Sequence, residues 1–235
     1  MPGVPEAPAW PGDALEAHWL DPRLLLSQTC GYPLTGRLRG RVQLVGVFRH
    51  TARGCDGIRY SSLLVVREDD PAQRIDDFRG RTAAYNAADS QSGYHSLLAL
   101  VAPLAEGGRF FGRALASGAH ARSIELVKGG QADIAAIDCI SYASFARVRP
   151  ESLRGLRVIG ATGSAPGLPL VTAAATSARD LAALRHAVEA AFDDPSLGDT
   201  RAALFLGSFE TVTEDAYEPI AELRRRALAL GCEAL

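Results

Sequence analysis

The chain has 235 residues, and its shares of hydrophobic and charged residues, 47% and 22%, are ordinary for a globular protein with a sizeable core. A formal net charge of -2 without a basic stripe excludes the electrostatic surface that nucleic-acid-binding proteins present. No apolar run approaches the roughly 20 residues of a membrane-spanning helix, so we expect no insertion into a membrane.

The first part of the chain predicts a Pro-rich irregular segment at 1–12 and a short helix at 13–19. An apolar strand at 24–26 then runs into the turn 28–33. Pro33 suits the first position of a helix, because the N–H that proline lacks has no partner there. Alternating apolar residues predict two more strands and a glycine-containing loop between them, at 41–48, 60–67 and 50–57.

The segment 81–94 carries the clearest indication of function. A β-prone run at 81–86 ends in small and polar residues, and a helix with an apolar stripe follows from about Tyr94. The first turn of a helix has unpaired N–H groups and a positive dipole end, and Ser90 and Ser92 add hydroxyl donors. These features predict a seat for a small oxyanion. An ordinary N-cap is the alternative, because Asp and Ser are common caps.

Two further strand-to-helix turns have the same character. A strand at 110–116 leads into the turn 117–120 and a helix that ends before a Gly-Gly pair. A buried strand at 133–137 ends in Asp138, and a helix follows at about 141–147. The remaining expected elements are strands at 156–160 and 170–173 and helices at 177–192, 195–206 and 214–230.

This alternation predicts an α/β fold with mainly parallel sheets, because helical crossovers join parallel strands. The strand-to-helix turns of such a sheet lie on one edge, where α/β proteins bind ligands. We therefore expect four polar turns to share one cleft, namely Gln28–Tyr32, Ser90–Tyr94, Ser117–His120 and Asp138–Ser141. Polar and glycine-rich breaks indicate that one lobe is inserted into another. We predict lobe one at 1–75 and 165–235, and lobe two at 76–164.

The cysteines and histidines give no sign of a metal centre. Cys-x-x-Cys spacing and the His pair of zinc proteases are both missing. We therefore expect no metal and no cofactor, and we expect buried free thiols rather than a disulfide framework. The alternative is a nucleophile at Cys30 or Cys139 with His120 as its base. Trp10 and Trp19 are expected to pack in the core or near the terminus.

Five segments resemble, in order and spacing, the phosphate/phosphite/phosphonate-type ABC transporter substrate-binding proteins. They span roughly residues 20 to 210 and read LLLSQTCGYPL, YSSLLVVREDDP, FRGRTAAYNAADSQSGY, SGAHARSIELVKGGQADIAAIDC and APGLPLVTA. The resemblance implies a two-lobed type II periplasmic-binding-protein-like fold, with sheets flanked by helices. It also implies a small-molecule anion as ligand, hinge closure, and an ABC permease as partner. We expect the protein to be a monomer.

The resemblance also implies which residues contact the ligand. The family's oxyanion sits on the Ser-rich helix start, which matches residues 90–93. Asp138 matches an acid that can face an amino group of a phosphonate, or it only caps a helix. His120 contacts the oxyanion or lies at the surface, and Tyr32 closes over the ligand or merely packs. The expected ligand-binding residues are Thr29, Cys30, Tyr32, Tyr60, Ser62, Ser90, Gln91, Ser92, Gly93, Tyr94, His120 and Asp138.

The start of the chain departs from the family pattern. Family members usually begin with a further strand and helix, so we expect lobe one to be N-terminally truncated, with an exposed sheet edge. Residues 1–19 lack a secretory signal, which predicts a cytoplasmic protein, or a periplasmic one if the true start lies upstream.

The lack of a secretory signal in residues 1–19 favours a second function, that of a cytosolic enzyme with the same fold. It would resemble menaquinone- or thiamine-precursor biosynthetic enzymes and act on a small carboxylate or phosphate. Asp138 or His120 would then be the acid–base group, and residues 90–93 would hold the substrate. A cytosolic sensing module is a third alternative.

Overall fold

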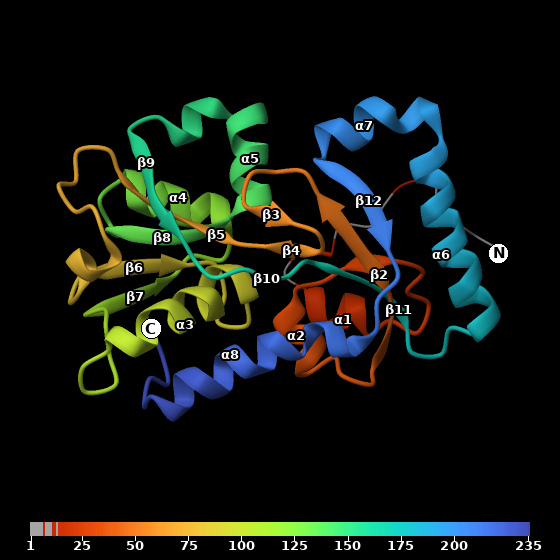
Figure 1. The fold of residues 1–235 in the computed structure, drawn as a ribbon, viewed down its shortest axis with the longest axis horizontal. Coiled ribbons are helices and arrows are strands. Elements are labelled where there is room, and N and C mark those ends of the chain that lie inside the picture. Colours follow the sequence, from red (N-terminus) through yellow and green to blue (C-terminus); the bar gives the residue numbers. More distant parts are fainter. Residues whose placement is uncertain (1–6, 8–10, 13) are drawn as a thin grey trace.

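Two β-sheets, each covered by helices, lie side by side in this computed structural model (Figure 1). The structure describes residue 7, residues 11–12 and residues 14–235. Trp10 and most of the predicted irregular segment 1–12 therefore lie outside the described residues. We call the half that contains the four-stranded sheet lobe one, and the half that contains the five-stranded sheet lobe two.

Lobe one has the strand order β1-β11-β2-β12, and each neighbouring pair is antiparallel. Its strands are β1 (Ser27–Gln28), β2 (Val42–His50), β11 (Pro169–Ala173) and β12 (Leu206–Glu210). Its helices are α1 (Leu15–Trp19), α2 (Gly31–Thr35), α6 (Ala178–Asp193) and α7 (Gly198–Ala203), with a 3-10 turn at Pro195–Leu197. Trp19, Leu34 and Val171 share one buried core, which confirms that Trp19 packs inside.

Lobe two has the strand order β7-β6-β8-β5-β9. Its strands are β5 (Ser62–Arg67), β6 (Thr82–Tyr85), β7 (Arg113–Ala116), β8 (Ile134–Asp138) and β9 (Leu156–Ala161). Its helices are α3 (Ser96–Val101), α4 (His120–Lys128) and α5 (Cys139–Val148). Shorter turns are the π-helical turn η2 (Gln91–His95) and 3-10 turns at Ile75–Phe78, Ala102–Leu104 and Pro150–Leu153.

The central strand β8 is buried along its whole length. Because side chains alternate across a strand, Ile134 packs with Leu97 of α3, whereas Ile137 packs with Ile124 of α4. Both faces of the sheet are therefore covered, and the polar end of β8 at Asp138 is held rigidly between them.

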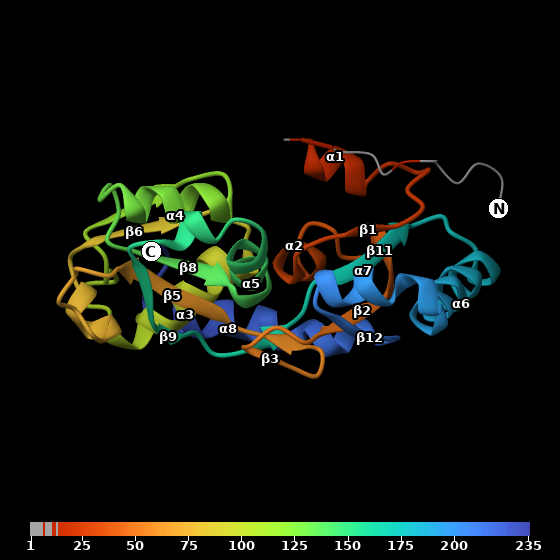
Figure 2. The same cartoon turned by 90° about the horizontal axis from the view of Figure 1, so that it is seen from above.

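Two segments carry the chain between the lobes, and they pair in a small sheet of their own. This sheet has the order β10-β4-β3, with β3 (Cys55–Asp56), β4 (Arg59–Tyr60) and β10 (Ala165–Pro166). Tyr60 lies opposite both Cys55 and Ala165 in the register. The sheet lies at the junction of the lobes, where β3 is visible in Figure 2.

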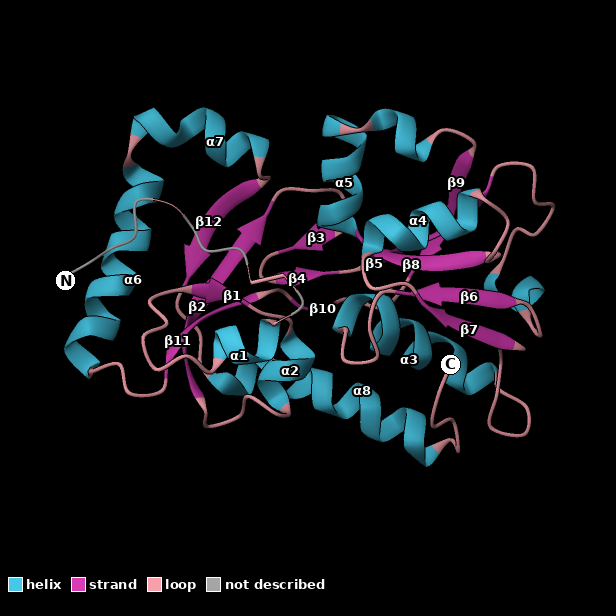
Figure 3. Ribbon diagram, turned by 180° about the vertical axis from the view of Figure 1, so that it is seen from behind, coloured by secondary structure: helices cyan, strands magenta, loops and turns pink. Residues whose placement is uncertain are grey.

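A C-terminal helix also connects the lobes. After a 3-10 turn at Glu214–Tyr217, α8 (Glu218–Ala229) contacts α2 of lobe one and α3 of lobe two (Figure 3). Ile220 belongs to the core of lobe one, whereas Ala227 packs against Leu98 of α3. Within the described part of the chain, none of the helices combines the length and the apolar character that crossing a bilayer requires.

The structure corrects three expectations. The sheets are not mainly parallel: only β6 pairs in parallel, with β7 and β8. The segment 195–206 is not one helix, because Phe205 adopts a left-handed φ of 57° after α7 and β12 follows. Residues 62–67, assigned to lobe one, form β5 and pair with β8 and β9 of lobe two. The other predicted lobe boundaries stay predictions.

Candidate ligand-binding site

Backbone N–H groups from two separate turns meet at the thiol of Cys30. Cys30 precedes α2, and Ser90 precedes the π-helical turn η2. The amide of Gln91 donates a hydrogen bond to Cys30 Sγ at 3.1 Å. Burial is the largest influence on this thiol and raises its pKa, while the nearby N–H groups of residues 31, 32, 91 and 92 act in the opposite direction. The net rise keeps Cys30 a neutral thiol, which argues against a nucleophile.

The Ser-rich turn is held in place by its neighbours. Ser90 Oγ accepts a hydrogen bond from the amide of Gly93 at 3.1 Å, so Ser90 is a true N-cap. Ser62 Oγ donates to the carbonyl oxygen of Ser92 at 2.9 Å. A Cβ at Gly93 would overlap Asn86 Oδ1 and lie 3.2 Å from His120 Cε1. Gly93 is thus required by side-chain packing, and its predicted contact with a ligand stays a prediction.

A hydrogen-bonded chain joins Ser92, His120 and Asp138. His120 Nε2 lies 3.0 Å from Ser92 Oγ and 3.2 Å from Asp138 Oδ2. A carboxylate only accepts hydrogen bonds, so we assign the ring proton to Nε2. Because both partners share that nitrogen, the arrangement differs from a Ser-His-Asp relay, in which the carboxylate holds the other nitrogen.

Asp138 caps a helix, which is one of the two roles that the sequence left open, and its contact with a ligand stays a prediction. Its Oδ1 accepts from the amide of Ser141 at 2.7 Å and so caps α5, while Oδ2 faces His120. Burial is the largest influence on the pKa of His120 and lowers it, and the charge of Asp138 raises it only in part. His120 is therefore a neutral ring at neutral pH.

Several buried side-chain N and O atoms of the protein have no hydrogen-bond partner among the described residues. They include Thr29 Oγ1, Tyr60 OH, Gln91 Oε1 and His120 Nδ1 of the predicted site, and Asn86 Oδ1 beside Gly93. An unpaired buried polar group costs about 1–3 kcal/mol, which a hydrogen-bonding ligand would recover. Burial is the largest cause that raises the pKa of Tyr60 and the charge of Asp138 adds to it, so the Tyr60 hydroxyl belongs to the same cluster.

We name this group the donor cluster. It consists of Thr29 Oγ1, Tyr60 OH, Ser92 Oγ, and the N–H groups of Gly31, Tyr32, Gln91 and Ser92, with the His120 ring beside Ser92.

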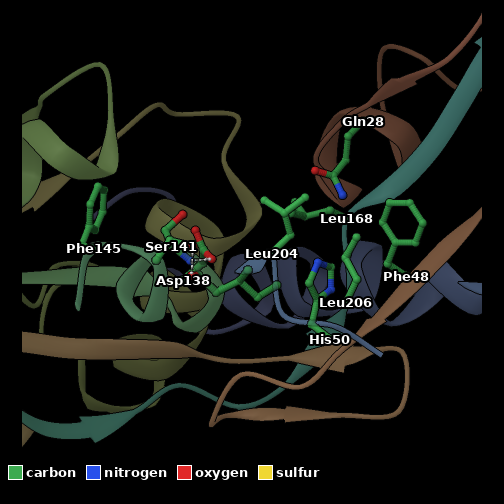
Figure 4. Close-up of a pocket in the computed structure, with 11 residues that line it drawn as sticks. Gln28, Phe48, His50, Asp138, Ser141, Phe145, Leu168, Leu204 and Leu206 are labelled. Atoms are coloured by element: carbon green, nitrogen blue, oxygen red, sulfur yellow. Dashed lines mark hydrogen bonds between the residues drawn. The ribbon is translucent and has the colours of Figure 1, made fainter. Parts of the chain in front are cut away.

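A cavity of about 370 Å³ lies between the lobes and has Asp138 in its wall (Figure 4). Lobe one contributes Gln28, Phe48 and His50, and the start of α5 contributes the wall around Ser141. Burial is the main influence that lowers the pKa of His50, against the opposing charge of Asp138. Asp138 therefore stands between the donor cluster on one side and this mostly apolar cavity on the other.

Two predicted site residues have other contacts. Tyr32 stacks on His95 with ring centroids 3.5 Å apart, and its closure over a ligand stays a prediction. The Tyr94 hydroxyl accepts a hydrogen bond from the amide of Leu235 at 3.4 Å. Its predicted contact with a ligand has no support from this packing.

Sequence reasoning missed three residues, namely Phe48 and His50 of the cavity and Asn86 beside Gly93, whereas Gln28 lies in one of the predicted polar turns. Asn86 ends the strand-like run before the Ser-rich turn, and that position could have identified it. The cavity residues carry no comparable signal. Among the described residues, no group of three or more His, Cys, Asp or Glu side chains is placed to hold a metal ion.

The sequence matches one family model over residues 29–217, described as ABC transporter, phosphonate, periplasmic substrate-binding protein. The chain belongs to this family. Members are periplasmic, and their place in ABC transport implies a permease and a small-molecule ligand. No curated protein matches the sequence.

Solved structures confirm the type II periplasmic-binding-protein fold. PhnD1 from Prochlorococcus marinus in complex with methylphosphonate is similar with a TM-score of 0.72 and 16% identity, over 91% of this chain and 82% of that one. A binding protein component of an ABC phosphonate transporter from Pseudomonas aeruginosa gives 0.72 and 20%, over 87% and 69%. XAC2383 from Xanthomonas citri bound to ATP gives 0.68 and 18%, over 92% and 82%.

Proposed function

We propose that this chain captures a small oxyanion of the phosphonate or phosphate class at the donor cluster, as the substrate-binding component of an ABC transporter. The observation that carries the proposal is the convergence of polar groups from four separate turns. Gln91 N–H reaches Cys30, and His120 Nε2 lies within hydrogen-bond distance of both Ser92 and Asp138. Hydrogen bonds to an anion are roughly twice as strong as neutral ones, so such a cluster favours a charged guest.

Uncharged donors suit this ligand. Tyr60, Thr29 and Ser92 supply neutral hydroxyl groups, and burial keeps the adjacent His120 ring neutral. Main-chain and hydroxyl dipoles can stabilise an anion without a paired cation, particularly at the first turn of a helix. The ligand would approach the Cys30 thiol and share its amide donors.

The position of Asp138 supports an organic substituent on the anion. A head group in the donor cluster would direct its substituent toward the inter-lobe cavity of about 370 Å³. Asp138 lies at that boundary with one carboxylate oxygen near His120. An ammonium group on the substituent would gain a charge-assisted hydrogen bond there. We therefore expect aminoalkylphosphonates to bind better than bare phosphate.

A thermal-shift screen tests the proposal with phosphate, methylphosphonate, 2-aminoethylphosphonate, methanesulfonate and acetate. A ligand at about one hundred times its Kd stabilises the folded state by about 2.7 kcal/mol, which raises the Tm by about 5–10 °C. We expect that rise with the phosphonates and little with acetate. Ser92→Ala and Tyr60→Phe should each reduce it.

Ser152→Ala is the matched control. Ser152 lies outside the donor cluster, and its hydroxyl donates a hydrogen bond to the carbonyl oxygen of Arg149. It should keep the full ligand-induced shift. The proposal fails if no phosphorus oxyanion raises the Tm, or if Ser92→Ala and Tyr60→Phe both respond like the wild type.

A further inference from the structure

Two cysteines lie side by side where the chain crosses between the lobes. Cys55 Sγ is 3.4 Å from Cys139 Sγ. Cys55 begins β3 of the crossing sheet, and Cys139 begins α5 of lobe two. Cys55 is partly exposed and Cys139 is buried. A reagent in solution can therefore reach Cys55 directly, and Cys139 through Cys55.

The backbone around this pair is fixed by hydrogen bonds and by one glycine. The amide of Cys139 donates to the carbonyl oxygen of Ser61 at 3.0 Å. Ser61 in turn donates to the carbonyl oxygen of Gly54 through its amide, at 3.1 Å, and its hydroxyl, at 3.0 Å. Gly54 has a φ of +103°, and a Cβ there would lie 3.0 Å from Cys139 Cβ.

The two sulfurs already lie so close that a small movement joins them. They would close from 3.4 Å to the roughly 2.0 Å of a covalent bond. The compartment of the family is the periplasm, which is oxidising. We propose that Cys55 and Cys139 form a disulfide there, and that this bond fastens the crossing hairpin to the first turn of α5.

The reaction is a two-step exchange with a low-molecular-weight disulfide as the oxidant. Cys55 loses its proton to solvent, and its sulfur attacks the oxidant, whose S–S bond breaks and releases one thiolate. Cys139 then attacks the Cys55 sulfur of the mixed disulfide, loses its proton, and expels the second thiolate. The two protein thiols lose two electrons, and the oxidant gains them as two thiols.

The second step is favoured by the surroundings of Cys139. Its hydrogen bond from Cys55 is the largest influence that lowers the pKa of Cys139, and backbone N–H groups add to it. The backbone contribution persists after Cys55 has reacted. The same hydrogen bond raises the pKa of Cys55, so the loss of the Cys55 proton to solvent limits the first step.

Mass spectrometry of a non-reducing tryptic digest tests the bond directly. The full chain is equilibrated with oxidised and reduced glutathione and then alkylated. Cys55 lies in peptide 54–59 and Cys139 in peptide 129–147, whereas Cys30 and Cys232 lie in two other peptides. We expect a cross-linked species of 54–59 with 129–147, lighter by two hydrogens than the two free peptides.

Thermal unfolding gives a second measurement. The bond closes a long loop, so we expect oxidation to raise the Tm by about 5–15 °C. Cys55→Ser and Cys139→Ser should lose this redox-dependent shift, and Cys232→Ser should keep it. Cys55 is partly exposed, so Cys55→Ser alone suffices if Cys139→Ser does not fold.

Two results would overturn the proposal. One is the absence of the cross-linked peptide at oxidising glutathione ratios, or its replacement by links to Cys30 or Cys232. The other is a redox-dependent Tm shift that persists in Cys55→Ser. Neither outcome depends on which anion the protein binds, so this test is separate from that of the proposed function.

Discussion

The guanidinium carbon of Arg147 lies 4.3 Å from the ring centroid of Phe205, and this contact joins α5 of lobe two to the end of α7 in lobe one. Arg147 also donates a hydrogen bond to the carbonyl oxygen of Ala202. Phe205 is held in a left-handed conformation with φ 57°, which costs a non-glycine residue roughly 1–2 kcal/mol. The two lobes are therefore fastened at this side of their junction by one exposed arginine.

Arg147→Ala should weaken the closed arrangement. An exposed cation–π contact contributes about 0.5–1 kcal/mol, so ligand affinity should fall about twofold to fivefold if ligand binds the closed form. Calorimetry with methylphosphonate measures this, and small-angle scattering should show a larger radius of gyration. Arg149→Ala removes a nearby exposed arginine and should change neither quantity. An unchanged Kd in Arg147→Ala would mean that the contact does not bias closure.

His95 should make the protein less stable in mild acid. Burial is the main cause that lowers the pKa of His95 to about 4. Between about pH 6.5 and 4 the unfolded chain binds a proton at this residue that the folded chain does not, so stability falls as the pH falls. From pH 7.5 to 5, this residue should cost about 2 kcal/mol.

Urea unfolding at both pH values measures the effect. His95→Phe keeps a ring to stack on Tyr32 and should lose this part of the pH dependence. His186→Gln, at an exposed position of α6, should behave as the wild type. Equal pH dependence in His95→Phe and the wild type would contradict the prediction.

Gly93→Ala should destabilise the fold by about 1–3 kcal/mol, because the added Cβ would overlap Asn86 Oδ1. Asn86→Ala in the same chain should restore most of that loss, since Asn86 supplies the two closest atoms. The coupling energy follows from a double-mutant cycle by denaturant unfolding. Gly163→Ala meets no atom within 4 Å and should change stability by less than about 0.5 kcal/mol. Additive single effects would refute the overlap.

Asp138→Asn should lower the affinity for a phosphonate that carries an amino group more than the affinity for one that does not. Asparagine is also a good N-cap, so α5 keeps its start. Loss of the carboxylate should weaken 2-aminoethylphosphonate about tenfold or more, and methylphosphonate by less than about threefold. Titration calorimetry compares the two ligands. Asp194→Asn alters another capping aspartate and should leave both affinities alone. Equal losses for both ligands would remove the proposed role of Asp138.

The convergence of the polar turns could be predicted because it depends on the order of the elements. Strands that precede Ser92, His120 and Asp138 are the parallel ones, β6, β7 and β8, so their carboxyl ends share an edge. Thr29 and Cys30 reach the same place from lobe one by a route that no local pattern encodes. The cavity wall at Phe48 and His50 depends on how the lobes meet, which is a long-range property.

The expectations that the structure corrects can each be traced to a physical cause. The strand β12 is short and contains Gly207, so its alternation was too weak to distinguish from a continued helix. The antiparallel pairing of β2 with β11 could not be read from their sequences, because buried strands of either kind are continuous apolar runs. The place of His120 between Ser92 and Asp138 required coordinates, since burial and ring orientation decide it.

The helix α8 has a mechanical consequence. It touches α2 at one end and α3 at the other, and its continuation ends on Tyr94. Any rotation of one half of the molecule against the other must therefore slide this helix over one of its two partners. A fluorophore attached to residue 235 would move with α8. Its emission should therefore report whether a ligand is bound.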